Sequence, residues 1–216
     1  MKGKTKMTKR ILSVLLALLL AMTVFVACDN EGENNNEGEN ENVAPVAENA
    51  EELLTKAYQA FAENLAPAFE MPAEDIMMSF MGGYYNENDE TTLKQGPGAV
   101  PVDNDAIASI ALLPADVTAK VDDAAMFQHP MMVNFFVGAA FRVTNAADVD
   151  AVANAMKDAI ANNQWVCGQP EGYYVIKVGN YVVSTYGLMD NINALKDAVT
   201  ATYESAVVVA EGSFIG

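Results

Sequence analysis

Sulfur and imidazole side chains gather in one short segment of this sequence, which contains Met126, His129, Met131 and Met132. Thioether sulfur and imidazole nitrogen are ligands that Cu(I) prefers, so this spacing is compatible with a soft-metal site. Methionine is also an adaptable filler of apolar cores, and the residues around these methionines are mostly apolar. We therefore expect Met77, Met78, Met126 and Met132 to pack in a core, and copper binding remains the alternative.

A Cys/His nucleophilic mechanism would have to use His129 and Cys167. These two residues are far apart in the chain, and neither belongs to a recognisable catalytic signature. The sequence also lacks the clustered Cys and His ligands of a zinc site and a glycine-rich phosphate loop after a strand. We therefore expect no enzyme activity and no cofactor.

Adjacent carboxylates, such as Asp122 with Asp123 and Glu74 with Asp75, are residue types used in general acid–base catalysis. However, 23 carboxylates follow residue 45, so adjacent pairs arise from composition alone. The segment 86–90 is rich in the oxygen ligands that Ca²⁺ prefers, but it lacks the spacing and the glycine of a calcium-binding loop. We interpret this segment as an exposed acidic loop.

The elements that would position these residues are clearest in the C-terminal half of the chain. Apolar runs predict strands over 117–127 and 132–143, with a turn at His129-Pro130 between them. An amphipathic helix with a capping signal at its start is predicted over 145–163. This part of the chain therefore forms a predicted strand-strand-helix unit.

A second unit of the same kind follows. The runs 173–178 and 181–186 are rich in β-branched and aromatic residues, and Gly179-Asn180 between them is a signal for a tight hairpin. A last helix, capped by Asp190 or by the residue after it, presents apolar residues on one face. The two units together predict a sheet of at least four strands.

The first part of the folded region is predicted to be helical and irregular. Apolar residues spaced three and four apart predict a helix over 47–65 that ends at Pro67. A short helical piece is predicted over 69–81 and another between 103 and 113. Several glycines and prolines predict an irregular loop over 82–101.

The order of these elements predicts an α+β fold. The two strand-strand-helix units over 114–216 can share one antiparallel sheet with both helices on a single face, which is a two-layer sandwich. The helical and loop part over 45–113 precedes this sandwich. The final segment 206–216 either prolongs the last helix or adds an edge strand. We expect one domain over 45–216, which is long enough to bury its own core.

The first 27 residues have the composition of an export signal. Five basic residues and no acidic residue occupy the first ten positions, and an apolar run follows from Ile11 to Ala27. This run is slightly shorter than the ~20 apolar residues of a retained membrane span, and it stops at Cys28-Asp29. We therefore interpret residues 1–27 as a signal peptide.

The sequence Val24-Phe25-Val26-Ala27-Cys28 resembles the lipobox of bacterial prolipoproteins, with Phe25 where Leu is usual. This resemblance implies that Cys28 receives a diacylglyceryl group and becomes the first residue of the mature chain. Two acyl chains are sufficient for stable anchoring in a membrane. The resemblance thus implies a lipoprotein on the extracytoplasmic face of the cell membrane, with the membrane as a partner through Cys28.

The segment from about 113 to 203 contains Phe141-Arg142-Val143 at the end of a predicted strand and the predicted hairpin over 175–182. In this pattern it resembles a family of small lipoproteins from Gram-positive bacteria that carry a domain of unknown function. The resemblance covers roughly half of the mature chain. It implies an extracytoplasmic α/β domain and assigns no catalytic residue.

Residues 29–42 consist only of Asp, Asn, Glu and Gly, which have no apolar surface to bury. We therefore expect residues 28–44 to be an acidic flexible tether that holds the domain away from the lipid. Without the leader the chain has 7 basic and 29 acidic residues, which gives a net charge of −22. This charge excludes nucleic acid as a partner, because phosphates are repelled.

Two classes of function remain open. The first is a non-enzymatic binding or interaction module of the cell envelope, which the missing catalytic constellations favour. The second is a carrier for a soft metal or a small solute, held in a cleft beside the 82–101 loop. Tyr84, Tyr85 and Trp165 are candidates to line such a cleft, but we expect these aromatic residues to pack in the core. A pocket with convergent polar groups would favour the second class. The sequence does not identify the protein or solute partner.

Overall fold

The computed structural model describes residues 46–131, 135–166 and 168–215. The predicted signal peptide, Cys28 and the acidic tether lie outside these residues, as do Met132 and Cys167. Residues Val43–Gly216 form one compact unit, and both hydrophobic cores of the described chain lie within it. This unit therefore has what a domain needs to fold by itself. Among the described helices, none is both long and apolar enough to cross a membrane.

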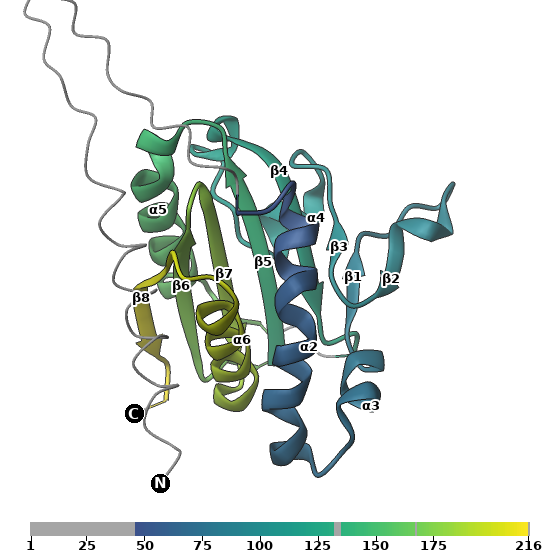
Figure 1. The fold of residues 1–216 in the computed structure, drawn as a ribbon. Coiled ribbons are helices and arrows are strands. Elements are labelled where there is room, and N and C mark those ends of the chain that lie inside the picture. Colours follow the sequence, from purple (N-terminus) through teal and green to yellow (C-terminus); the bar gives the residue numbers. More distant parts are fainter. Residues whose placement is uncertain (1–45, 132–134, 167, 216) are drawn as a thin grey trace, which may run out of the picture. The chain divides into compact units, whose positions relative to one another are not determined.

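An antiparallel sheet forms the centre of the compact unit (Figure 1). Its strands are β1 (Met81–Gly83), β2 (Leu93–Gln95), β3 (Gly98–Ala99), β4 (Val121–Gln128), β5 (Phe136–Val143), β6 (Gly172–Val178), β7 (Tyr181–Gly187) and β8 (Ala206–Ser213). They lie in the order β2-β1-β4-β5-β7-β6-β8, and β3 also pairs with β4. The predicted α+β class with an antiparallel sheet is confirmed.

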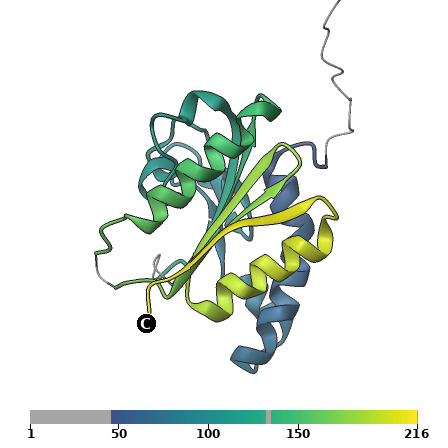
Figure 2. The same cartoon turned by 90° about the vertical axis from the view of Figure 1, so that its left-hand side faces the viewer.

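Helices cover both faces of this sheet, as Figure 2 shows. The helices are α2 (Ala50–Phe69), α3 (Ala73–Met78), α4 (Asp105–Ser109), α5 (Val149–Ala161) and α6 (Met189–Thr202). α2 and α6 pack on one face, whereas α5 packs on the other. The prediction of two layers with all helices on one face is therefore wrong, because the unit has three layers.

The opposite placement of α5 and α6 follows from the connections between strands. α5 connects β5 to β6 across β7, and α6 connects β7 to β8 across β6. Both connections move in the same direction across the sheet, but they start from antiparallel strands. Crossovers between parallel strands are right-handed in nearly all proteins. Two right-handed crossovers in this arrangement place their helices on opposite faces.

Each face of the sheet has its own hydrophobic core. Under α2 and α6, the rings of Phe61, Phe127 and Phe136 are fully buried, with centroids 5.0 to 5.3 Å apart. Under α5, Met156 packs in a second core that includes Phe141. β5 contributes to both cores because successive residues of a strand point to opposite faces.

The segment 82–101, predicted as an irregular loop, contributes three short strands to one edge of the sheet. Gly82, Gly83 and Gly98 are strand residues at places where two backbones approach closely, and Gly96 lies in the bend between β2 and β3. A Cβ atom on Gly82 would lie 2.2 Å from the carbonyl oxygen of Gly96, and one on Gly98 would lie 2.4 Å from the nitrogen of Gly83. The glycines that indicated a loop are therefore required by backbone pairing.

Two helix ends in the N-terminal part differ from the prediction. Pro67 lies inside α2, which continues to Phe69 and ends at Glu70 with a φ of 53°. Proline removes one backbone donor near this end, where the helix is already close to stopping. The helix predicted between 103 and 113 is shorter, because α4 spans Asp105–Ser109 and is capped by Asn104, whose Oδ1 accepts from the Ala106 N–H.

The turn between β6 and β7 requires a glycine, since Gly179 has a φ of 58°. The next helix, α6, begins at Met189, whose N–H donates to Glu171 Oε2 at 2.7 Å. The predicted cap at Asp190 or Asn191 is therefore wrong. A side chain from before β6 satisfies the helix start instead, which no local pattern indicates.

Candidate functional site

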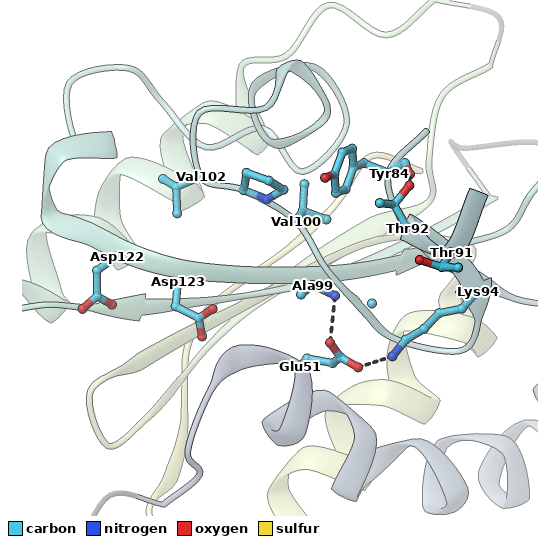
Figure 3. A pocket seen from close by; sticks show the side chains of 12 residues that line it. Glu51, Tyr84, Thr91, Thr92, Lys94, Ala99, Val100, Val102, Asp122 and Asp123 are labelled. Carbon is cyan, nitrogen blue, oxygen red and sulfur yellow. Dashed lines mark hydrogen bonds and ion pairs between the residues drawn. The ribbon is translucent and has the colours of Figure 1, made fainter. Parts of the chain in front are cut away.

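A groove of about 450 Å³ lies between the start of α2, strand β4 and the short strands of the sheet edge (Figure 3). Its polar lining residues are Glu51, Thr91, Thr92, Lys94, Asp122 and Asp123. Tyr84, Val100 and Val102 provide an apolar strip. The groove lies beside the 82–101 segment, where a cleft was predicted.

Glu51 bridges the start of α2 to the edge of the sheet. One of its carboxylate oxygens accepts a hydrogen bond from the Lys94 ammonium, and the other accepts from the Ala99 N–H at 3.1 Å (Figure 3). The position of Glu51 in the first turn of α2 also suits a carboxylate, because the helix dipole is positive there. Both oxygens are therefore already used in fastening the helix to β2 and β3.

Asp122 and Asp123 have different partners although they are adjacent. Asp123 Oδ2 accepts from the N–H of Ala50, the first residue of α2, at 2.6 Å. This N–H has no partner within its own helix. Asp122 Oδ1 accepts from Arg142 Nε at 2.7 Å, and Arg142 Nη1 donates to the Glu48 carbonyl at 2.9 Å. The bond to Asp122 raises the pKa of Arg142, which is charged at every physiological pH.

The polar side chains that line the groove form hydrogen bonds with other groups of the protein. The Thr92 hydroxyl donates to the Tyr84 carbonyl at 2.7 Å, and the Thr91 hydroxyl donates to Asp89 at 2.6 Å. In the described part of the chain, no group of three or more His, Cys, Asp or Glu side chains is placed to hold a metal ion. The groove joins α2 to the sheet, and its geometry contains no nucleophile with an adjacent base.

The residues of the copper alternative do not converge where the structure describes them. Met126 is buried in the core under α5. The His129 ring packs against Phe80 of the other core, with centroids 6.2 Å apart, and burial lowers the pKa of His129. Core packing is confirmed for Met126 but wrong for Met78, which is 56% exposed. Met131 lies in the connection between two strands and is 84% exposed. Met132 lies outside the described residues.

Of the three aromatic residues expected to line a cleft, Tyr84 does line the groove. Tyr85 is 78% exposed. Trp165 packs far along the sheet against Tyr186, with ring centroids 4.8 Å apart, and against Phe214 at 5.9 Å. The expectation that these aromatic residues pack in the core is confirmed for Trp165, which packs against the core cluster under α5, and it is wrong for Tyr85.

A second cavity of about 220 Å³ lies where the end of α2, α3 and the start of α6 meet. Its apolar wall consists of Leu65, Phe69, Met71, Ile76, Phe80, Phe135 and Leu188, and its polar members are Ser79, His129 and Asn191. Asn191 is 2% exposed, and its Oδ1 has no hydrogen-bond partner among the described residues. From the sequence, Asn191 was predicted only as a possible helix cap, and no local pattern indicates this cavity.

Strand β8 forms an edge of the sheet, and no described strand pairs with its outer side. Val207, Val208 and Val209 are 54%, 37% and 41% exposed. The strand has neither lysine nor proline, which usually protect exposed edges against pairing. The pairing of β8 with β6 has one irregularity, between Val175 and Ile176. Irregularities of this kind disfavour the addition of another strand to an open edge.

Every lysine and arginine among the described residues pairs with a carboxylate. The pairs are Lys56–Glu52, Lys94–Glu51, Lys120–Asp148, Arg142–Asp122, Lys157–Asp158, Lys177–Asp150 and Lys196–Asp197. The remaining 16 of the 23 carboxylates after residue 45 have no lysine or arginine of the described chain within ion-pair distance. The described surface therefore carries a large excess of negative charge.

Comparison with known proteins gives no relative from which a function could be inferred, so the proposed function is based on the geometry. No protein-family model, no curated protein and no solved structure matches the chain.

Proposed function

We propose that this protein is a lipid-anchored, non-enzymatic interaction module on the extracytoplasmic face of a bacterial cell membrane. In this proposal it binds an extended segment of a partner protein along the outer edge of β8. The observation that carries the proposal is the row of three exposed valines in this edge strand. An open strand edge offers backbone N–H and carbonyl groups to an added strand, and neighbouring side chains provide specificity.

Charge supports a basic partner segment. The domain from residue 46 onward has 7 basic and 23 acidic residues, and all its cationic side chains are already paired. Glu204 and Glu211 are exposed on either side of the valines. Complementary charge accelerates association and suppresses wrong partners, so a second copy of this acidic chain is disfavoured.

The polar groove supports a role that is not catalytic, because its carboxylates hold α2 on the sheet. The second candidate function is a carrier for a small solute, and the largely apolar cavity at Asn191 is the observation that favours it. A soft-metal carrier has less support, since Met126 and His129 pack in different cores.

The membrane location rests on the leader and on the lipobox-like sequence before Cys28. We expect Cys28→Ala to abolish the incorporation of a clickable fatty acid in growing cells and to release the protein from the membrane fraction. A variant that is labelled as strongly as the wild type would contradict the anchor.

Photo-crosslinking in intact cells tests the docking edge. The full chain carries a photoreactive phenylalanine analogue at Val209, and a control chain carries it at Tyr85, another exposed apolar residue. We expect a discrete adduct with a partner protein from position 209 and none from position 85. Adding Val207→Lys to the first chain should remove the adduct, because a lysine blocks strand pairing. A higher ionic strength should lower the adduct yield if the partner segment is basic.

Two outcomes would contradict the proposal. The same adducts from positions 209 and 85 would show nonspecific contact. Adducts that consist of two copies of this chain would identify self-association at β8.

A further inference from the structure

The cavity beside Asn191 combines an apolar wall with one unmatched acceptor. The orientation of the Asn191 amide is determined, because its Nδ2 donates to the Phe135 carbonyl at 3.0 Å. A flipped amide would place two oxygen atoms against each other. The Oδ1 atom is therefore the acceptor that remains, and it is buried without a partner among the described residues. Such an atom has lost its bond to water without a replacement, which is unfavourable.

Among the described polar side chains of the cavity, Asn191 has the buried oxygen that makes no hydrogen bond. The Ser79 hydroxyl donates to the Asp75 carbonyl at 2.8 Å. His129 Nδ1 accepts from the Met131 N–H at 3.3 Å, and burial lowers the pKa of His129, which favours the neutral ring. No lysine, arginine or carboxylate is among the lining residues. The cavity thus has no charge with which to bind an ion.

The size of the cavity limits the ligand further. A dry cavity of about 150 Å³ lined by aliphatic and aromatic side chains is large enough to bind benzene. A cavity of about 220 Å³ therefore accommodates one ring with a small substituent, or an aliphatic molecule of similar size. We propose that this cavity binds a small neutral molecule with an apolar body and one hydrogen-bond donor, and that Asn191 Oδ1 accepts its hydrogen bond.

This site does not rest on the proposed function, since the cavity shares no residue with β8. Its described lining residues come from α2, α3, the end of β4, the start of β5 and the start of α6. Phe69 and Met71 are 47% and 39% exposed, so they lie where the cavity meets the surface. A small molecule can therefore enter beside the end of α2.

Calorimetric titration of residues 43–216 with two probes tests the site. Phenol and toluene have the same ring, but phenol alone has a donor. We expect Asn191→Leu to weaken the binding of phenol about tenfold, since one hydrogen bond contributes about that factor. Toluene should bind to the variant as tightly as to the wild type, or more tightly. An equal loss of both probes would overturn the role of Asn191.

A second variant locates the site without altering the amide. Ser79→Leu places extra volume in the cavity and should abolish the binding of both probes. Ser109→Leu is the matched control, because Ser109 makes the same hydrogen bond to the carbonyl four residues before it but lies in α4, outside the cavity. Unchanged phenol binding in Ser79→Leu would overturn the location. The absence of binding of either probe to the wild type at millimolar concentration would overturn the proposal itself.

Discussion

Replacing Asp123 by alanine tests how α2 is held on the sheet. Asp123 Oδ2 accepts from the N–H of Ala50, and Ala50 is fully buried. Without this carboxylate the N–H loses its partner in a place that water reaches poorly. The neighbouring Asp122 is a natural control, because it has the same charge but forms an ion pair with Arg142 whose side chains are 45% and 32% exposed.

The two substitutions should differ clearly in the free energy of unfolding. A hydrogen bond to a charged group contributes about 1.5–3 kcal/mol, and a carboxylate at a helix start adds about 0.3–1 kcal/mol. We expect Asp123→Ala to cost about 2–3 kcal/mol after partial relaxation. An exposed ion pair contributes about 0–1 kcal/mol. Asp122→Ala should cost about 0.5 kcal/mol or less, since removing one negative charge from this acidic domain also relieves repulsion.

Urea unfolding of residues 43–216 measures this difference. Both variants should keep the slope of the wild type and change only the midpoint. Asp123→Asn retains a neutral acceptor and should lose about half as much stability as Asp123→Ala, because charge-assisted hydrogen bonds are about twice as strong as neutral ones. Equal midpoints for Asp122→Ala and Asp123→Ala would refute the claim that Asp123 caps α2.

Three further predictions concern the turn, the histidine and the core. Gly179→Val should lower the free energy of unfolding in urea by about 1–3 kcal/mol, because φ is 58° and the new Cβ would lie 3.3 Å from Val46 Cγ2. Gly179→Asn should lose less stability, because asparagine tolerates positive φ. The wild type should lose stability between about pH 7 and pH 5, because His129 has a lowered pKa in the folded chain and a pKa near 6.5 in the unfolded chain, which therefore binds a proton first. His129→Gln should reduce this loss. Equal slopes of unfolding free energy against pH for both proteins would contradict this. Phe61→Ala should cost about 3–5 kcal/mol in the same assay, because its ring is fully buried between other aromatic rings.

Local periodicity was enough to predict elements that a short window of sequence specifies. The apolar run of β5, the amphipathic pattern of α5 and the Gly179-Asn180 turn all correspond to elements near the predicted positions. The candidate groove was predicted only by its place beside the 82–101 segment and by Tyr84. Glu51 and Lys94, which cross it, were missed because their partners lie far away in the chain.

Composition and patterns of a few residues were enough to predict the α+β class and the strongly acidic surface. The export signal rests on patterns of the same kind and stays a prediction. Only the folded chain shows which face each helix covers, because with right-handed crossovers this face depends on the order and direction of the strands. It also shows that glycines of the 82–101 segment lie in strands, that Glu171 caps α6, and that the Asn191 oxygen is buried at a cavity. Each of these depends on groups that are distant in sequence and adjacent only after folding.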